Sequence, residues 1–323
     1  MINQQRRNLL AAALVSGVAS SVAGCVTGSQ SRSDANALIT KPIPVSGERL
    51  PVIGIGTNSF TKKELEPLHS VLSRMVELSG VWIDTAAAYG ESEAVIGQLL
   101  SDLKIRNRVF LATKLVGDGT QRVEGPGALG SEWDGVTGLA SFERSLRLLR
   151  TDHVDLLQVH SLKGIDTAIP QMLEWKKAGK LRYIGITTSS GAEHAQLLEA
   201  MQRWPVDFIQ VDYSLANRAA AEEVLPLAQQ RRIGVSINLP LGGKRRTLIQ
   251  EAGDRALPAW AAEFDAGTWA QFFLKYVVSH PVVSCAVPGS TKVNHLEDNQ
   301  AAARGRLPDA AMRKRMEVFW DAG

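Results

Sequence analysis

The chain has 323 residues, of which 45% are hydrophobic and 21% are charged, and its formal net charge is +3. This near balance of charges gives no indication of a nucleic-acid partner or of another strongly charged partner. The length beyond residue 40 suits one large α/β barrel, since such barrels typically run to about 250 residues or more.

The first residues predict an export signal. Arg6 and Arg7 precede an apolar stretch that is too short, and too often interrupted by Ser and Gly, for a comfortable membrane-spanning helix. The paired arginines resemble a twin-arginine signal, and Val22 to Cys25 resembles the cleavage box of bacterial lipoproteins. We therefore expect residues 1–24 to be removed and Cys25 to be lipidated, which would place the protein in the periplasm on a lipid anchor. Cleavage nearby, giving a soluble periplasmic protein, is the alternative.

Residues 25–40 are small and polar, and we expect a flexible tether because they offer too little apolar surface to offset the entropy of ordering. The barrel is predicted to occupy residues 41–323. At its start, the Ser46-Gly47 turn between extended residues predicts a β-hairpin across the barrel floor.

From residue 50 onward, short β-rich runs alternate with longer helical patterns, which is the rhythm of parallel βα units and predicts an α/β fold, a (β/α)8 TIM barrel. The predicted strands are Val52–Gly56, Val81–Asp84, Val109–Lys114, Val154–Val159, Tyr183–Thr187, Phe208–Val211, Gly234–Ile237 and Val283–Val287. The predicted helices are Glu64–Leu78, Glu91–Leu103, Leu139–Leu149, Ala168–Ala178, Glu193–Gln202, Ala219–Arg231 and Thr268–Ser279, with one more at the C-terminus.

Two connections are unusually long, residues 115–138 and 239–267, and long connections in a compact domain are often lids or binding loops. The first contains Trp133, a candidate substrate contact. The second contains a basic run, Gly242 to Arg246, that suits a phosphate-bearing ligand. The lone Cys285 in an apolar run is interpreted as a core residue.

Four polar residues lie where predicted strands end: Asp84, Tyr89, Lys114 and His160. The carboxyl ends of barrel strands share one rim, so these side chains are expected to meet there. A carbonyl carbon that accepts a hydride leaves charge on its oxygen, and a neutral acid must then supply a proton. Tyr89 suits that role if Lys114 lowers its pKa, which is ordinarily about 10. Asp84 would hold Lys114 charged, and His160 would orient the carbonyl oxygen.

The ordered set of Asp84, Tyr89, Lys114 and His160 resembles the catalytic tetrad of the aldo-keto reductases. Further matches are residues 50–57, 145–156, 180–186 and 287–290, so the resemblance covers residues 41 to about 303. It implies an NADPH-dependent reductase of aldehydes or ketones, with NADH as the alternative cofactor, and it implies a small-molecule carbonyl substrate. No metal is implied.

The resemblance also implies cofactor-binding residues, since no Gly-rich Rossmann loop occurs. They are Gly56, Thr57, Asn58, Asp84, Thr187, Thr188, Gln210, Asn238, Pro240, Leu241, Gly242, Gly289, Ser290, Thr291, Lys292 and Asn299. The chain departs from the family at the nicotinamide end. Thr187-Thr188 replaces the usual Ser-Asn, and Asn238 replaces an aromatic ring that stacks on the cofactor. Losses of this kind amount to about 1–2 kcal/mol each.

Two other functions therefore stay open. One is a barrel that has stopped reducing substrates and binds a nucleotide or small ligand as a sensor or partner subunit. The other is an isomerase or lyase that uses the same acid-base residues on a carbonyl compound. The sequence leaves the oligomeric state undecided.

Overall fold

The computed structural model describes residues 37–116, 140–243 and 246–323. The predicted export signal, Cys25, most of the predicted tether, Trp133 and the basic residues Lys244 and Arg245 lie outside these ranges. Within the described residues, no helix is both long enough and apolar enough to cross a membrane.

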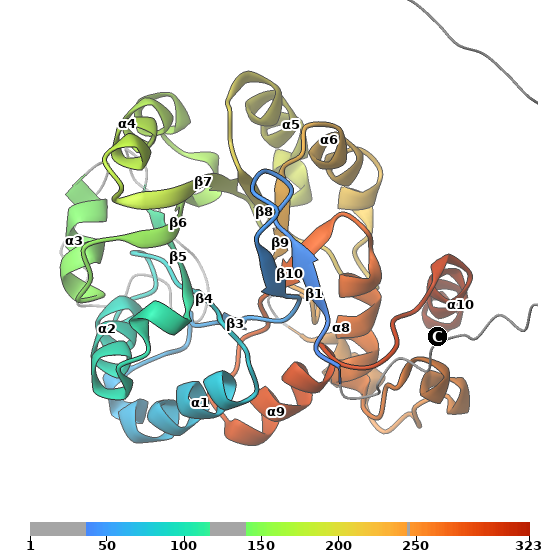
Figure 1. Cartoon of the computed structure of the whole chain (residues 1–323). Helices are drawn as coiled ribbons and strands as arrows, with labels where there is room; N and C mark the ends of the chain where they lie inside the picture. The colour runs from blue at the N-terminus through green and yellow to red at the C-terminus, as the bar shows by residue number, and fades with distance from the viewer. Residues whose placement is uncertain (1–36, 117–139, 244–245) are drawn as a thin grey trace, which may run out of the picture. The chain divides into compact units, whose positions relative to one another are not determined.

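Eight parallel strands follow one another in chain order around a barrel (Figure 1). They are β3 (Ile55–Gly56), β4 (Trp82–Asp84), β5 (Phe110–Leu115), β6 (Val154–Val159), β7 (Leu181–Thr187), β8 (Phe208–Val211), β9 (Gly234–Ile237) and β10 (Val283–Ala286). Isolated bridges from Ile53 to Ala286 and from Gly56 to Gly289 join the first strand to the last. The predicted barrel is therefore confirmed, and each strand lies within a few residues of its predicted range.

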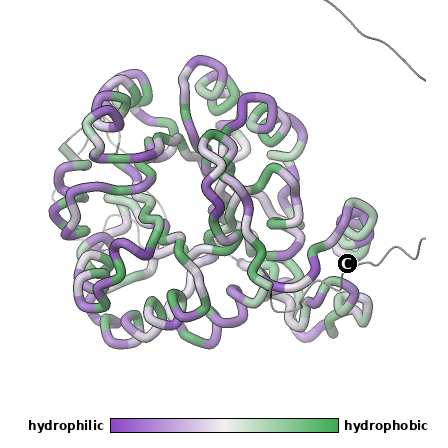
Figure 2. The backbone as a smooth tube through the Cα atoms, in the orientation of Figure 1, coloured by the Kyte–Doolittle hydropathy of each residue, from purple (hydrophilic) through white to green (hydrophobic). Residues whose placement is uncertain are grey.

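Helices surround the strands on the outside of the barrel (Figure 1). The helices between strands are α1 (Leu65–Glu77), α2 (Ser92–Leu103), α3 (Ala140–Leu148), α4 (Ile165–Lys177), α5 (His194–Arg203), α6 (Val224–Gln230), α7 (Leu248–Ala252) and α8 (Trp269–Ser279). Two more follow the last strand, α9 (Val293–Ala301) and α10 (Ala310–Asp321). The tube in Figure 2 shows apolar and polar residues alternating along these helices, as expected for elements with one buried face.

Three predictions about helices were wrong in detail. The single helix expected over residues 219–231 is a 3-10 turn, Ala219–Ala221, followed by α6. Pro226 lies in the first turn of α6, where its ring would clash with the carbonyl four residues earlier in a longer helix. One C-terminal helix was expected and two are present. The connection 239–267 contains α7, which a capping box of Thr247 and Gln250 starts, and a 3-10 helix, Ala259–Phe264.

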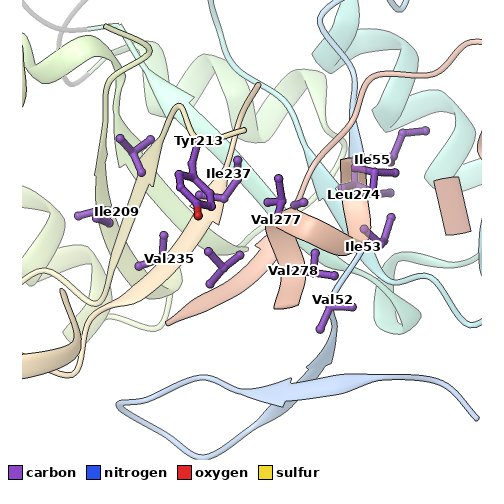
Figure 3. Close-up of a cluster of buried hydrophobic side chains, with 14 of the residues drawn as sticks. Val52, Ile53, Ile55, Ile209, Tyr213, Val235, Ile237, Leu274, Val277 and Val278 are labelled. Atoms are coloured by element: carbon purple, nitrogen blue, oxygen red, sulfur yellow. The ribbon is translucent and has the colours of Figure 1, made fainter. Parts of the chain in front are cut away.

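The main core fills the space between the strands and the helices. Figure 3 shows part of it, where Ile209 of β8 and Val235 and Ile237 of β9 lie in the same cluster as side chains of α8. Leu274, Val277 and Val278 supply the helix side of this layer, and all of these residues are fully buried. This layer fixes the strands, and hence the rim, as a rigid platform.

The predicted hairpin is present as β1 (Thr40–Pro42) paired antiparallel with β2 (Arg49–Pro51). Ile43 and Leu50 bury their side chains in a second apolar cluster with Trp82, Phe110 and Phe208. These three aromatic residues are the first residues of β4, β5 and β8, so the hairpin closes the amino-terminal end of the barrel. The floor is thus sealed, and chemistry is left to the opposite rim.

Inward-facing positions change from apolar to polar along the strands. Side chains alternate between the two faces of a strand, so Phe110 and Lys114 of β5 share the inner face, as do Leu156 and Gln158 of β6. Lys114 pairs with Gln158 in the register of β5 and β6. The barrel interior is therefore aromatic at the floor and polar beneath the rim.

Candidate active site

A buried ion pair forms the base of the site. Lys114 donates a hydrogen bond to Asp84, with 2.6 Å between Nζ and Oδ2, and a second one to the Thr85 carbonyl at 3.0 Å. Gln210 donates from Nε2 to the other Asp84 oxygen at 2.9 Å. Because both charged side chains are almost fully buried, each depends on the other for the stabilisation that water would otherwise supply.

This pair keeps Lys114 positively charged. Burial by itself lowers the pKa of the Lys114 ammonium, but the Asp84 carboxylate and Tyr89 act in the opposite direction, and the net pKa is raised. The ammonium therefore remains protonated next to the rim at neutral pH.

Tyr89 lies in the turn that follows β4, where its backbone N–H donates to the Ala86 carbonyl at 3.0 Å. Its ring centroid is 5.0 Å from the Lys114 ammonium. We expected a lowered pKa for Tyr89, but burial raises it, and the nearby positive charge of Lys114 only reduces the increase. Without a bound ligand, Tyr89 is thus a neutral phenol that can donate a proton.

His160 directly follows β6 and faces Tyr89, with 5.7 Å between the ring centroids and 82° between the ring planes. Burial, and then the charge of Lys114, lower the pKa of His160 to about 3. The imidazole is therefore neutral, which suits a hydrogen-bond donor to a carbonyl oxygen. The four residues predicted at separate strand ends are thus brought together at one rim.

The residues predicted to contact the cofactor occupy the ends of neighbouring strands. Gly56 ends β3 beside Gly289, and a Cβ at Gly56 would lie 2.8 Å from the Val287 carbonyl oxygen. Thr57 is fully buried, and its hydroxyl donates to the Asp84 carbonyl at 2.9 Å. The Thr57 side chain therefore holds β3 against β4, and the backbone N–H groups of Gly56 and Thr57 also donate within the barrel, to the carbonyls of Pro288 and Asp84 at 3.0 and 3.1 Å.

At the other side of the rim, the side chains of Thr187, Thr188 and Asn238 have structural partners. The Thr187 hydroxyl accepts from the Ser161 backbone N–H at 3.1 Å, and the Thr188 hydroxyl donates to the carboxylate of Glu193. Asn238 donates from Nδ2 to the Thr188 carbonyl at 3.0 Å. Thr188 was predicted to contact the cofactor with a hydroxyl where the family has an amide, but in this structure that hydroxyl is engaged in its own turn.

The remaining predicted cofactor residues follow β9 and β10. Pro240, Leu241 and Gly242 form a turn in which the Gly242 N–H donates to the Leu239 carbonyl at 3.0 Å. Gly289 to Lys292 lead into α9, where Ser290 Oγ donates to the Lys292 carbonyl at 3.0 Å. Asn299 is a buried residue of α9. These segments adjoin the catalytic rim, as the barrel topology requires.

The residues present fit a dinucleotide, although the part of the site that would hold the nicotinamide differs from the family pattern. Gly289 is exposed beside Gly56 where β3 meets β10, and the Oδ1 atom of Asn238 is a buried acceptor that has no partner among the described residues. Position 238 carries an asparagine in place of the aromatic ring that would stack on the nicotinamide. Within the same part of the chain, no group of three or more His, Cys, Asp or Glu side chains could hold a metal ion.

Sequence reasoning missed Gln158. This residue is fully buried, lies opposite Lys114 and Gly185 in the strand register, and has no hydrogen-bond partner for either amide atom among the described residues. Leu156, Gln158 and His160 stand at every second position of β6 and of the residue directly after it, and this alternation could have placed Gln158 on the inner face.

A neutral phenol thus lies beside a buried ammonium-carboxylate pair and a neutral imidazole at the rim of a (β/α)8 barrel, an arrangement able to donate a proton to a bound ligand. The model of the aldo/keto reductase family matches residues 52–318, and the chain belongs to this family of oxidoreductases. Methylglyoxal reductase YeaE of Escherichia coli is 29% identical over 286 residues, which cover 84% of this chain and 92% of that protein.

Solved structures agree with this assignment. The aldo-keto reductase AKR11C1 from Bacillus halodurans, in its holo form, superposes with a TM-score of 0.68 at 25% identity and covers 88% of this chain and 96% of its own. An aldo/keto reductase from Klebsiella pneumoniae in complex with NADP and acetate gives a TM-score of 0.64 at 25% identity, and covers 85% of this chain and 93% of its own.

Proposed function

We propose that this protein reduces an aldehyde or ketone to an alcohol with NADPH, and that Tyr89 is the general acid. The arrangement of Tyr89 over the Lys114 ammonium, which Asp84 holds at 2.6 Å, carries the proposal. A buried ammonium maintained by a carboxylate has little structural value in itself, because a well-packed apolar pair is often at least as stable. The buried ammonium is instead useful because its positive charge acts on the phenol of Tyr89.

Each of the four residues has a distinct role. Tyr89 holds the proton in the resting site and releases it to the carbonyl oxygen as charge develops there. Lys114 stabilises the phenolate that remains, and Asp84 keeps Lys114 charged and in place. His160, neutral because of burial, donates a hydrogen bond that orients the carbonyl oxygen toward Tyr89.

When bound, the nicotinamide supplies the hydride that reaches the carbonyl carbon. Residues 56–58, the turn at 240–242 and residues 289–292 would hold the phosphates and the adenosine, and Lys292 would supply positive charge for a 2'-phosphate. Gln210 and Asn238 would lie toward the nicotinamide end. The Klebsiella pneumoniae structure named above, which is a complex with NADP, supports this choice of cofactor.

The substrate is proposed to be a small aldehyde, ketone or 2-oxoaldehyde. The name of the Escherichia coli relative, a methylglyoxal reductase, supports including the last of these. We test the function by titrating the domain from residue 37 onward with NADPH while following protein fluorescence, and then by following the loss of NADPH absorbance with a panel of carbonyl compounds.

Binding should saturate below millimolar NADPH, and at least one compound should be reduced. In the Tyr89→Phe variant, reduction should disappear while the affinity for NADPH stays within about twofold, because the phenol acts on the substrate rather than on the cofactor. Retained reduction in that variant would exclude Tyr89 as the acid. No binding at millimolar NADPH would exclude the reductase and favour the ligand-binding barrel.

We further propose that the protein is exported and anchored by a lipid on Cys25. The twin arginines and the short apolar stretch before Cys25 support this. Export in the folded state would let the barrel leave the cytoplasm with its cofactor bound, which matters because free NADPH is not expected outside the cytoplasm.

A further inference from the structure

Unpartnered polar atoms are concentrated beneath the candidate active site. The described residues contain eight buried side-chain nitrogen or oxygen atoms without a hydrogen-bond partner, and three of them belong to Gln158 and His160. They are Nε2 and Oε1 of Gln158 and Nδ1 of His160. A fully buried amide that makes no hydrogen bond lowers the stability of the fold, so its retention inside a barrel calls for a reason.

The two side chains lie on the same face of one segment. Gln158 belongs to β6, and His160 directly follows β6 as the first residue of a 3-10 turn, His160–Leu162. Val159 between them has extended backbone, so the side chains of Gln158 and His160 leave the chain on the same side, with Cα atoms about 6–7 Å apart. Gly185 makes room for this arrangement: a Cβ at Gly185 would lie 3.0 Å from Cγ of Gln158. The glutamine side chain thus occupies space that a larger residue on β7 would take.

The other polar groups near Gln158 are already engaged. Lys114, its neighbour in register, directs Nζ toward Asp84 and the Thr85 carbonyl on the β4 side. Both oxygens of Asp84 are occupied, one by Lys114 and one by Gln210. Gly185, the neighbour on the other strand, has no side chain. His160 Nδ1 is therefore the unpartnered group next to Gln158 at the rim.

The pairing has a chemical consequence because a neutral imidazole carries one proton. If Gln158 donates from Nε2 to the lone pair of Nδ1, the proton must sit on His160 Nε2, which can then donate to a carbonyl oxygen. If Gln158 accepts through Oε1 instead, the proton sits on Nδ1 and the other nitrogen cannot donate. The orientation of one amide thus decides whether His160 can act.

We propose that Gln158 is a positioning residue whose amide N–H group reaches Nδ1 of His160 across one water molecule and holds the imidazole as the Nε2–H tautomer. The amide does not touch the substrate. It acts through His160, and it explains why a polar side chain is kept at this depth of the barrel.

The direct test is the tautomer of His160, measured by nitrogen NMR on the folded domain with labelled histidine; His160→Asn identifies the signal among the six histidines. The wild-type spectrum should show the proton on Nε2 and a hydrogen-bonded, unprotonated Nδ1. A proton on Nδ1 in the wild type overturns the proposal without any variant. This measurement is independent of the proposed function.

Three variants extend the test. Gln158→Glu offers only acceptors when ionised and should move the proton to Nδ1, whereas Gln158→Met should leave a mixture of tautomers. Gln300→Met is the matched control, since Gln300 is also a buried glutamine with an unpartnered oxygen, but lies on α9. It should leave the His160 signal unchanged. An unchanged signal in both Gln158 variants would refute the proposal.

Kinetics provide a second readout, and this part rests on the proposed reductase function. Gln158→Met should lower kcat by about 10-fold to 100-fold, since loss of an oriented donor to an oxyanion costs about 10²-fold or more. The dissociation constant for NADPH should change less than twofold. If the wild type does not reduce any carbonyl, the reductase fails while the tautomer result still decides the role of Gln158. Equal loss in Gln300→Met would assign the effect to stability instead.

Discussion

The buried pair of Asp84 and Lys114 makes a quantitative prediction for stability. Replacing Lys114 with Met keeps the length of the side chain but leaves the Asp84 carboxylate buried, with Gln210 as its remaining side-chain hydrogen-bond partner. Breaking a buried ion pair by removing one partner costs about 3–5 kcal/mol. Lys114→Met should therefore lower the free energy of unfolding by that amount, as measured by urea denaturation followed by circular dichroism.

The double variant provides the control. Asp84→Asn alone should also be destabilising because it leaves the Lys114 ammonium buried without a full counter-charge. In Asp84→Asn/Lys114→Met no charge remains to be compensated, and we expect a loss of about 1–2 kcal/mol, far below the sum of the single losses. Activity should be lost in all three variants. If Lys114→Met changed the unfolding free energy by less than about 0.5 kcal/mol, or if the losses were additive, the pair would not be coupled as described.

Three further predictions follow from single positions. Burial lowers the pKa of His160 to about 3, so His160 binds a proton more readily in the unfolded chain. Its contribution to stability should be fully present above pH of about 6.5 and fall toward pH 3 by at most about 1.4 kcal/mol per pH unit. His160→Gln should reduce the acid slope of the unfolding free energy by that amount, and His280, whose pKa is lowered to about 4, should keep its own part of the slope. Gly56→Ala should destabilise the barrel by about 1–3 kcal/mol because its Cβ would lie 2.8 Å from the Val287 carbonyl, whereas Gly191→Ala, with nothing within 4 Å, should change the melting temperature little. Cys25→Ala should abolish lipid labelling and membrane association in cell fractionation; a variant that still sediments with membranes would contradict the proposed anchor.

The positions of the strands could be predicted from sequence because β-rich runs alternate with helical patterns throughout the barrel. Asp84 and Lys114 were placed correctly for the same reason: each lies at the end of a strand, and adjacent parallel strands bring such ends together. The break in the helix predicted over residues 219–231 was missed, although Pro226 could have indicated it, since proline removes a donor and clashes with the preceding turn.

Other features depend on how deeply a side chain is buried and on which hydrogen-bond partner it has, and neither can be read from the sequence. The sign of the net pKa shift of Tyr89 follows from burial exceeding the effect of Lys114, and burial is set by the whole fold. The Thr188 hydroxyl was predicted to contact the cofactor, but it donates to Glu193, a contact that depends on the local turn. Gln158 was missed because its importance appears only when both amide atoms are seen to be buried and unpartnered.

Transfer of deuterium from NADPH labelled at the reactive C4 position of nicotinamide tests the central claim most directly. The protein is incubated with labelled NADPH and a carbonyl compound such as methylglyoxal, and the products are examined by mass spectrometry. A reductase of the proposed kind places one deuterium on the carbon of the new alcohol, and Tyr89→Phe abolishes this product. Conversion of the carbonyl compound without deuterium in the product would contradict hydride transfer and would identify acid-base isomerisation or elimination at the same four residues.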